Sequence, residues 1–143
     1  MSVCTFFGHR ECWDLAPETL EAAIADLIAQ GVDTFYVGYQ GQFDRFVLAC
    51  LRKLAVKYPY ISYSVVLVNL KDLREEFRDC SIYPEGMELV PPKFAMDRRN
   101  HWMVEHADFC ICYVNRDWGG AWKFARLAKR QGRSVRNLGS GKL

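Results

Sequence analysis

The stretch Phe109-Cys-Ile-Cys-Tyr-Val-Asn-Arg-Asp-Trp-Gly-Gly-Ala-Trp-Lys-Phe124 joins two different hydrophobic patterns through a pair of glycines. Residues 109–114 are continuously apolar, which is typical of a strand buried on both faces. Beyond Gly120 the apolar residues recur at helical spacing, as Ala121, Phe124, Ala125 and Ala128. A strand that leads through Gly-Gly into a helix brings backbone N–H groups and the positive end of a helix dipole to one point. This arrangement suits a phosphate.

The same alternation of strand and helix continues outward over the whole chain. Strand patterns occupy residues 3–7, 34–37, 62–68, 109–114 and 134–138, and helical patterns lie between them at 20–28, 46–54, 95–106 and 121–131. This order predicts an α/β fold, a three-layer Rossmann-like sandwich with a mainly parallel five-stranded sheet. Counted along the chain, the expected strand order is 3-2-1-4-5.

Length and composition indicate one globular domain spanning residues 1–143. The chain is 50% hydrophobic and 25% charged, which provides enough apolar material for a core. No apolar run approaches the roughly 20 residues that span a bilayer. The N-terminus also lacks the pattern of a signal peptide. We therefore expect a cytoplasmic protein with no membrane contact.

The cysteines and histidines do not follow a metal-site pattern. Most cysteines lie at apolar positions, where a free thiol behaves as a small buried hydrophobe, namely Cys4, Cys50, Cys110 and Cys112. His101 and His106 are five residues apart on a predicted helix and so point in different directions. We expect structural thiols, no metal and no cofactor.

Glycine-rich and polar residues follow strands 1, 2 and 4 of the predicted sheet. The strand order reverses between strands 1 and 4, and ligands of such folds bind beyond the carboxyl ends of the strands at that reversal. Three turns, joined by the start of the helix at 95–106, should therefore meet at one rim. The candidate ligand-binding residues are Gly8, His9, Arg10, Gly38, Gly41, Asp44, Arg98, Arg99, Asn100, Trp118, Gly119 and Gly120.

Each of these features also has a plain structural interpretation. A glycine turn often serves only the backbone geometry at a strand exit. Arg98 and Arg99 are also the kind of charges found on any helix surface. The G-x-x-G at 38–41 lacks the lysine and hydroxyl of a P-loop, and no serine lies in a nucleophile elbow. A phosphate-bearing ligand is favoured because these glycine turns and arginines should converge on one rim, and planar guanidinium groups bind phosphate bidentately.

Two further regions have unusual composition. Residues 70–95 form a long irregular stretch with several prolines, and such loops are usually lids or partner contacts. From Trp118 onward there is no Asp or Glu, whereas the basic residues are Lys123, Arg126, Lys129, Arg130, Arg133, Arg136 and Lys142. This asymmetry fits a solvated helix face, a positive field over a small anionic ligand, or nucleic acid.

Taken in order, these motifs resemble the SLOG superfamily of Rossmann-like nucleotide-ligand binders. That group includes LOG-type phosphoribohydrolases, the DNA-processing protein DprA and small YpsA-like proteins, of which the last are the most similar. The resemblance covers almost the whole chain. It rests on Phe6-Phe7-Gly8-His9-Arg10, on the G-x-x-G-x-x-D turn from Gly38 to Asp44, on Arg98-Arg99-Asn100 with Met103-Val104, and on Gly119-Gly120-Ala121 through Gly132 to Asn137-Leu138.

One departure from the LOG pattern bears on catalysis. The segment from Met96 to Asn100 resembles the M-x-x-R-K element of LOG enzymes, which implies that Arg99 occupies the catalytic arginine position and that Asn100 replaces lysine. The LOG loop P-G-G-x-G-T-x-x-E ends in a catalytic glutamate, whereas no acid follows Asp117 here. Cleavage of an N-glycosidic bond needs a carboxylate near the ribosyl centre. Asp44, Glu11 and Asp117 are all candidates, and the spacing singles out none of them.

We therefore expect a protein that binds a nucleotide or an ADP-ribose-type small molecule, as a sensor or a sequestering protein. In this reading Gly119 and Gly120 hold the phosphate, Arg10, Arg98 and Arg99 supply charge, Asp44 or Asn100 bonds the ribose, and Trp118, Tyr39 or Phe43 stacks on the base. One alternative is a nucleoside 5′-monophosphate phosphoribohydrolase that uses Arg99 and Asp44. A second is DprA-like binding of nucleic acid. The resemblance also implies a homo-oligomer.

Overall fold

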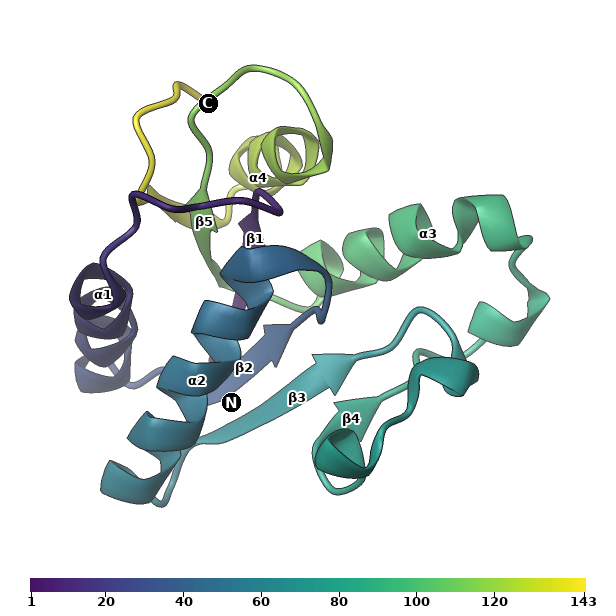
Figure 1. Cartoon of the computed structure of the whole chain (residues 1–143), viewed down its shortest axis with the longest axis horizontal. Coiled ribbons are helices and arrows are strands. Elements are labelled where there is room, and N and C mark those ends of the chain that lie inside the picture. The colour runs from purple at the N-terminus through teal and green to yellow at the C-terminus, as the bar shows by residue number, and fades with distance from the viewer.

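The computed structural model describes all residues from Met1 to Leu143. Its sheet is parallel throughout and has the strand order β4-β3-β2-β1-β5-β6 (Figure 1). The strands are β1 (Val3–Gly8), β2 (Thr34–Val37), β3 (Ser62–Val66), β4 (Ser81–Ile82), β5 (Phe109–Tyr113) and β6 (Ser134–Asn137). The helices are α1 (Pro17–Ala29), α2 (Gly41–Lys57), α3 (Pro92–Glu105) and α4 (Gly120–Arg130). The predicted α/β class, Rossmann-like layering and strand order are confirmed.

The sheet has six strands, so the predicted count of five is wrong. The additional strand β4 lies inside the stretch 70–95 that the sequence marked as irregular, and it pairs with the end of β3 through Val65↔Ser81 and Val66↔Ile82. Two residues are too few to produce an alternating pattern. Phe77 and Met87 are buried and anchor the rest of this segment, which otherwise consists of turns and short 3₁₀ helices.

Each face of the sheet packs on its own pair of helices (Figure 1). Phe6 and Ile111 belong to the core shared with α1 and α2, whereas Phe7 and Cys112 belong to the core shared with α3 and α4. Neighbouring residues of a strand point to opposite faces, so a strand covered on both faces must be apolar at every position. This explains the unbroken apolar run of β5, whereas the one polar residue of β1, Thr5, is buried with its hydroxyl donating to the Tyr36 carbonyl at 3.0 Å.

Two helices begin earlier than their apolar pattern suggested. Helix α2 starts at Gly41, and its first turn contains the polar Gln42 and Asp44, which do not belong to an apolar stripe. Helix α3 starts at Pro92, because proline fits the first turn of a helix, where its missing N–H would have no partner. As a result, Asp44 stands in the first turn of α2.

All six cysteines are free thiols, and the four predicted at apolar positions are buried. No group of three His, Cys, Asp or Glu side chains is arranged to hold a metal ion. None of the helices combines the length and the apolar character needed to cross a bilayer.

Candidate functional site

A cavity of about 500 Å³ opens at the carboxyl ends of β1, β2 and β5. Four segments of the chain meet around it: β1 with its following loop, the β2–α2 turn, one side of α3, and the β5–α4 loop. This is the reversal point of the strand order, where ligands of such sheets bind. The lining residues are Phe6, Phe7, Gly8, His9, Arg10, Glu11, Gly38, Gln40, Asp44, Met96, Arg99, Asn100, Met103, Arg116, Gly120 and Ala121.

Most of the predicted site residues line this cavity together. They are Gly8, His9, Arg10, Gly38, Asp44, Arg99, Asn100 and Gly120. The structure thus brings residues from all three predicted turns, and from the helix before β5, to one place. Of the three carboxylates that the spacing left open as candidates, Asp44 and Glu11 line the cavity and Asp117 does not.

The remaining predicted residues lie outside the lining. Arg98 is exposed although its neighbour Arg99 is buried, because successive residues of a helix point about 100° apart. Trp118 is 62% exposed on the β5–α4 loop. Gly41 and Gly119 have φ values of 87° and 94°, which favour glycine, so both serve the backbone path into the helices α2 and α4.

Two predicted stacking residues are engaged elsewhere. Phe43 is fully buried beneath Gly8 and has no surface to offer a base, so its predicted stacking role is wrong. The Tyr39 hydroxyl donates a hydrogen bond to Asp72 and accepts one of 3.0 Å from the backbone N–H of Val68. Tyr39 therefore ties the β3–β4 segment to the β2–α2 turn.

Arg99 is the most constrained polar side chain of the cavity. It is only 3% exposed, and its guanidinium donates to the carbonyl of Val66 at 2.7 Å, to Gln40 Oε1 at 2.9 Å and to Asn100 Oδ1 at 2.9 Å. Its centre also lies 5.8 Å from the ring of Tyr39. Burial lowers the pKa of Arg99, and the nearby charge of Asp44 opposes this shift. Arg99 thus connects α3 to β3 and to the β2–α2 turn.

Asp44 is a carboxyl group held inside the protein next to this arginine. It is 8% exposed, and its Oδ2 accepts a hydrogen bond of 2.9 Å from the backbone N–H of Gln40. Burial raises the pKa of Asp44 to about 6, even though Arg99, the Gln40 N–H and Arg10 all act to lower it. A buried carboxyl with a pKa close to neutrality is characteristic of functional sites.

The raised pKa of Asp44 makes stability fall as pH rises. The folded protein holds the Asp44 proton up to about pH 6, whereas the unfolded chain releases it near the ordinary value of 3.8. Protonation therefore favours the folded state most strongly at low pH, and this contribution, roughly 3 kcal/mol, is lost between those two values. Asp44→Asn removes the titration. We expect the variant to gain stability relative to the wild type as pH increases from about 4 to about 7.

Urea unfolding of both proteins across this pH range measures the difference directly. A stability difference that stays constant with pH would contradict the assigned burial of the Asp44 carboxyl. Asp26→Asn is a suitable control, because this exposed carboxylate pairs only with Arg136 at the surface.

Two glycines let the backbone approach neighbouring groups closely. A Cβ on Gly38 would lie 2.8 Å from Asp44 Oδ2 and 3.2 Å from Arg99 Nη2. A Cβ on Gly8 would lie 2.7 Å from the Cβ of Phe43 and closer still to its ring. The Asp44 carboxyl and the Arg99 guanidinium therefore both lie against the backbone of Gly38, and a side chain at either glycine would force its neighbours to shift.

His9 is held rigidly at the base of the cavity. It is buried, and its Nε2 accepts a hydrogen bond of 3.1 Å from the backbone N–H of Asn115. Burial lowers the pKa of His9, and the positive charge of Arg116 adds to the effect. The ring is thus neutral near pH 7 and carries its proton on Nδ1. His9 joins the loop after β1 to the loop after β5.

Helix α4 points its N-terminus at the cavity, where Gly120 and Ala121 belong to the lining. The first N–H of this helix with a backbone partner is that of Lys123, which donates to Gly119 at 3.0 Å. The preceding N–H groups of the first turn are free for an anion. Arg116 stands next to them and stacks on Trp118, with 3.9 Å between the guanidinium carbon and the ring centre.

Sequence reasoning missed Arg116, Gln40 and Met96 as lining residues. Arg116 lies three residues after the last residue of β5, a position where side chains reach the rim of a parallel sheet. Its place in the strand-to-helix loop was a usable signal.

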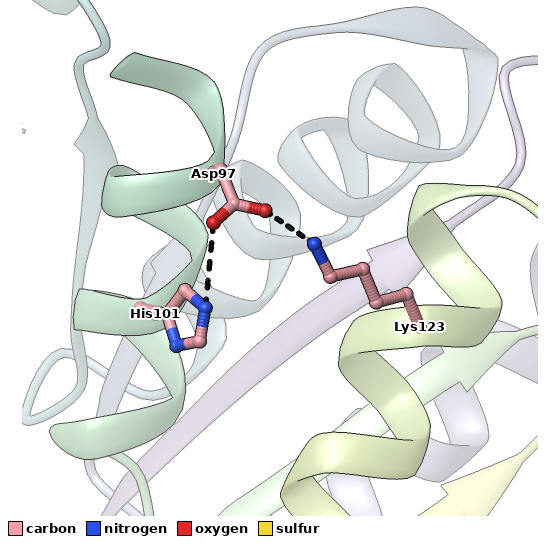
Figure 2. A network of polar contacts seen from close by, with 3 residues as sticks. All are labelled: Asp97, His101 and Lys123. Carbon is pink, nitrogen blue, oxygen red and sulfur yellow. Dashed lines mark hydrogen bonds and ion pairs between the residues drawn. The ribbon is translucent and has the colours of Figure 1, made fainter. Parts of the chain in front are cut away.

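The two helices that flank the cavity on one face are joined by charged residues. Asp97 of α3 pairs with Lys123 of α4 at 2.6 Å and with His101 at 3.4 Å (Figure 2). All three side chains are substantially exposed, and such pairs contribute about 0–1 kcal/mol. The Asp97–Lys123 pair links α3 to α4 at the protein surface.

The cavity thus combines free backbone donors, cationic side chains and a buried carboxyl around one open cleft. These groups suit a ligand that carries both an anion and hydroxyl groups. A scan against protein-family models found no family that matches the chain, and a search of curated proteins found no similar sequence.

Proposed function

We propose that the protein binds a nucleotide or an ADP-ribose-type small molecule in the cavity at the ends of β1, β2 and β5. The observation that carries this proposal is the meeting of helix α4, Arg116, Arg10 and Asp44 around one space of about 500 Å³. Pockets of about 300–1,000 Å³ are usual for small-molecule ligands.

The two sides of the cavity suit different parts of such a ligand. The N-terminus of α4 and Arg116 offer N–H donors and positive charge, which suit a phosphate. On the other side, Asp44 offers carboxylate oxygens and Asn100 retains its amide donors, since its Oδ1 already accepts from Arg99. These groups suit the hydroxyls of a ribose.

Binding without turnover is the simpler form of this proposal. No acidic residue follows Asp117, and the first turn of α4 contains no carboxylate that could assist cleavage. A site that holds a nucleotide-derived ligand without consuming it suits a sensor or a sequestering protein.

One observation favours a second candidate, a phosphoribohydrolase that cleaves the N-glycosidic bond of a nucleoside 5′-monophosphate. Asp44 lines the cavity and has a pKa of about 6. A carboxyl with such a pKa can protonate a leaving base or stabilise a cationic ribosyl centre. Arg99 would then position Asp44 and balance its charge.

Isothermal titration calorimetry with a panel of nucleosides, their 5′-monophosphates and their 5′-diphosphates, together with ADP-ribose, tests the proposal. We expect at least one phosphorylated compound to bind more tightly than its parent nucleoside. Failure of every phosphorylated compound to bind would contradict the proposal. Tight binding of single-stranded DNA with a steep salt dependence would favour nucleic acid instead.

Chromatography of the same mixtures distinguishes binding from hydrolysis. Release of free base by the wild type, and its loss in Asp44→Asn with binding retained, would establish the second candidate. Binding of the nucleotide without release of free base would exclude hydrolysis of the compounds tested and support the binding function.

A further inference from the structure

Arg116 is an exposed cation of the cavity with few contacts to the rest of the protein. Its side chain is exposed, forms no ion pair and donates no hydrogen bond to another residue. Its guanidinium stacks on the ring of Trp118, so its N–H groups remain available to a ligand. Charge-assisted hydrogen bonds from a guanidinium to a phosphate are among the strongest that proteins make.

The other two arginines of the cavity both act on the Asp44 carboxyl. Arg99 uses its N–H groups on Val66, Gln40 and Asn100, which leaves it little to offer a ligand. Arg10 is exposed and forms no ion pair, and its charge helps to lower the pKa of Asp44. Arg116 is the arginine that lies against Gly119, at the turn that opens α4.

The position of Arg116 matches the anion-binding end of the cavity. A Cβ on Gly119 would lie 3.5 Å from Arg116 Nη2, which places the guanidinium against the turn that opens α4. Its charge also acts on His9, at the base of the cavity. Arg116 and the free N–H groups of the α4 first turn therefore face the same space.

Trp118 is not part of the hydrophobic core, so packing in the core does not explain a large aromatic residue at this position. Its ring is 62% exposed and lies 3.9 Å from the guanidinium carbon of Arg116. Stacking on a ring face leaves the in-plane N–H groups of arginine free, and it restricts a side chain that otherwise has many rotamers. The ring thus orients Arg116 without occupying its donors.

We propose that Arg116 selects the anionic group of the ligand, that Trp118 acts as its positioning residue, and that the pocket therefore prefers a nucleoside diphosphate to the parent nucleoside. This inference rests on the proposed function, because it assigns the phosphate end of that same site. The ribose end, at Asp44 and Asn100, should contribute equally to the binding of nucleoside and nucleotide.

The test compares the affinities of a nucleoside 5′-diphosphate from the binding panel and of its parent nucleoside, measured by calorimetry. We expect Arg116→Ala to weaken diphosphate binding about tenfold or more while nucleoside binding changes less than about twofold. Arg116→Lys keeps the charge but loses the planar fork, so it should recover part of the loss. Trp118→Ala should weaken diphosphate binding by about two- to fivefold, and Trp118→Phe by less.

Arg52→Ala is the matched control, because it removes one positive charge from the exposed side of α2, away from the cavity. Equal losses for nucleoside and diphosphate in Arg116→Ala, or no loss at all, would overturn the inference while the proposed function stands. Wild-type protein that binds no phosphorylated compound would overturn both. Unchanged diphosphate affinity in Trp118→Ala would remove the positioning role of the ring.

Discussion

Arg99→Ala is expected to lower the free energy of unfolding by about 3–5 kcal/mol, the usual range when one partner of a buried charged network is removed. The variant removes the guanidinium that donates to the Val66 carbonyl and to Gln40 Oε1, and it leaves Asp44 buried without the positive charge beside it. Urea or guanidinium unfolding near pH 7 measures the loss. The effect should shrink toward about pH 4, where Asp44 is protonated.

Arg98→Ala provides the matched control one residue away. Its side chain is exposed and lies outside the cavity, so the change should stay within about 0.5 kcal/mol. Arg99→Lys should fall between the two, because lysine keeps the charge but cannot serve three acceptors in one plane. Similar losses for Arg98→Ala and Arg99→Ala would contradict the assigned burial of Arg99.

Gly8→Ala should destabilise the protein by about 3 kcal/mol or more, at the upper end of what overpacking causes. The new methyl group would lie 2.7 Å from the Cβ of Phe43 and closer still to its ring. Phe43 is fully buried, and it stands in the first turn of α2, so neither ring nor helix has room to retreat. Because Gly8 lines the cavity, ligand binding should weaken as well.

A double-mutant cycle isolates the cause of the Gly8 effect. Phe43→Leu removes the ring and should cost about 1–3 kcal/mol by itself as a large-to-small core change. In that background Gly8→Ala should cost less than it does in the wild type, by at least about 1 kcal/mol. Additive losses would show that the ring of Phe43 is not what excludes a side chain at Gly8.

The buried strands could be predicted because burial on both faces of the sheet requires a nearly continuous run of apolar residues. A strand covered on both faces is apolar at nearly every residue, as β5 is throughout and β1 is apart from the hydrogen-bonded Thr5. Strand β4 could not be found in this way. It is two residues long and half-buried, and its pairing with Val65 and Val66 depends on how residues 70–80 fold back toward β3.

The sequence predicted where the candidate site lies better than it predicted the role of each residue there. The rule that ligands bind at the strand reversal indicated the cavity, and glycines after β1, β2 and β5 marked its rim. The difference between Arg98 and Arg99 depends on the rotational setting of α3, and its sequence carries little amphipathic signal to reveal that setting. Arg116 was missed because a single arginine forms no motif, and only its place in the loop between β5 and α4 could have indicated it.

Backbone amide NMR during titration with a nucleoside 5′-diphosphate tests the central claim most directly, because glycine amides are readily recognised in such spectra. Ligand binding in the cavity predicts that the amides of Gly8, Gly38 and Gly120 shift together with that of Ala121, and that the titration saturates. Gly31, Gly86 and Gly132 lie outside the cavity and should not shift. Shifts confined to the exposed basic side of α4, or no shifts at all, would contradict the account.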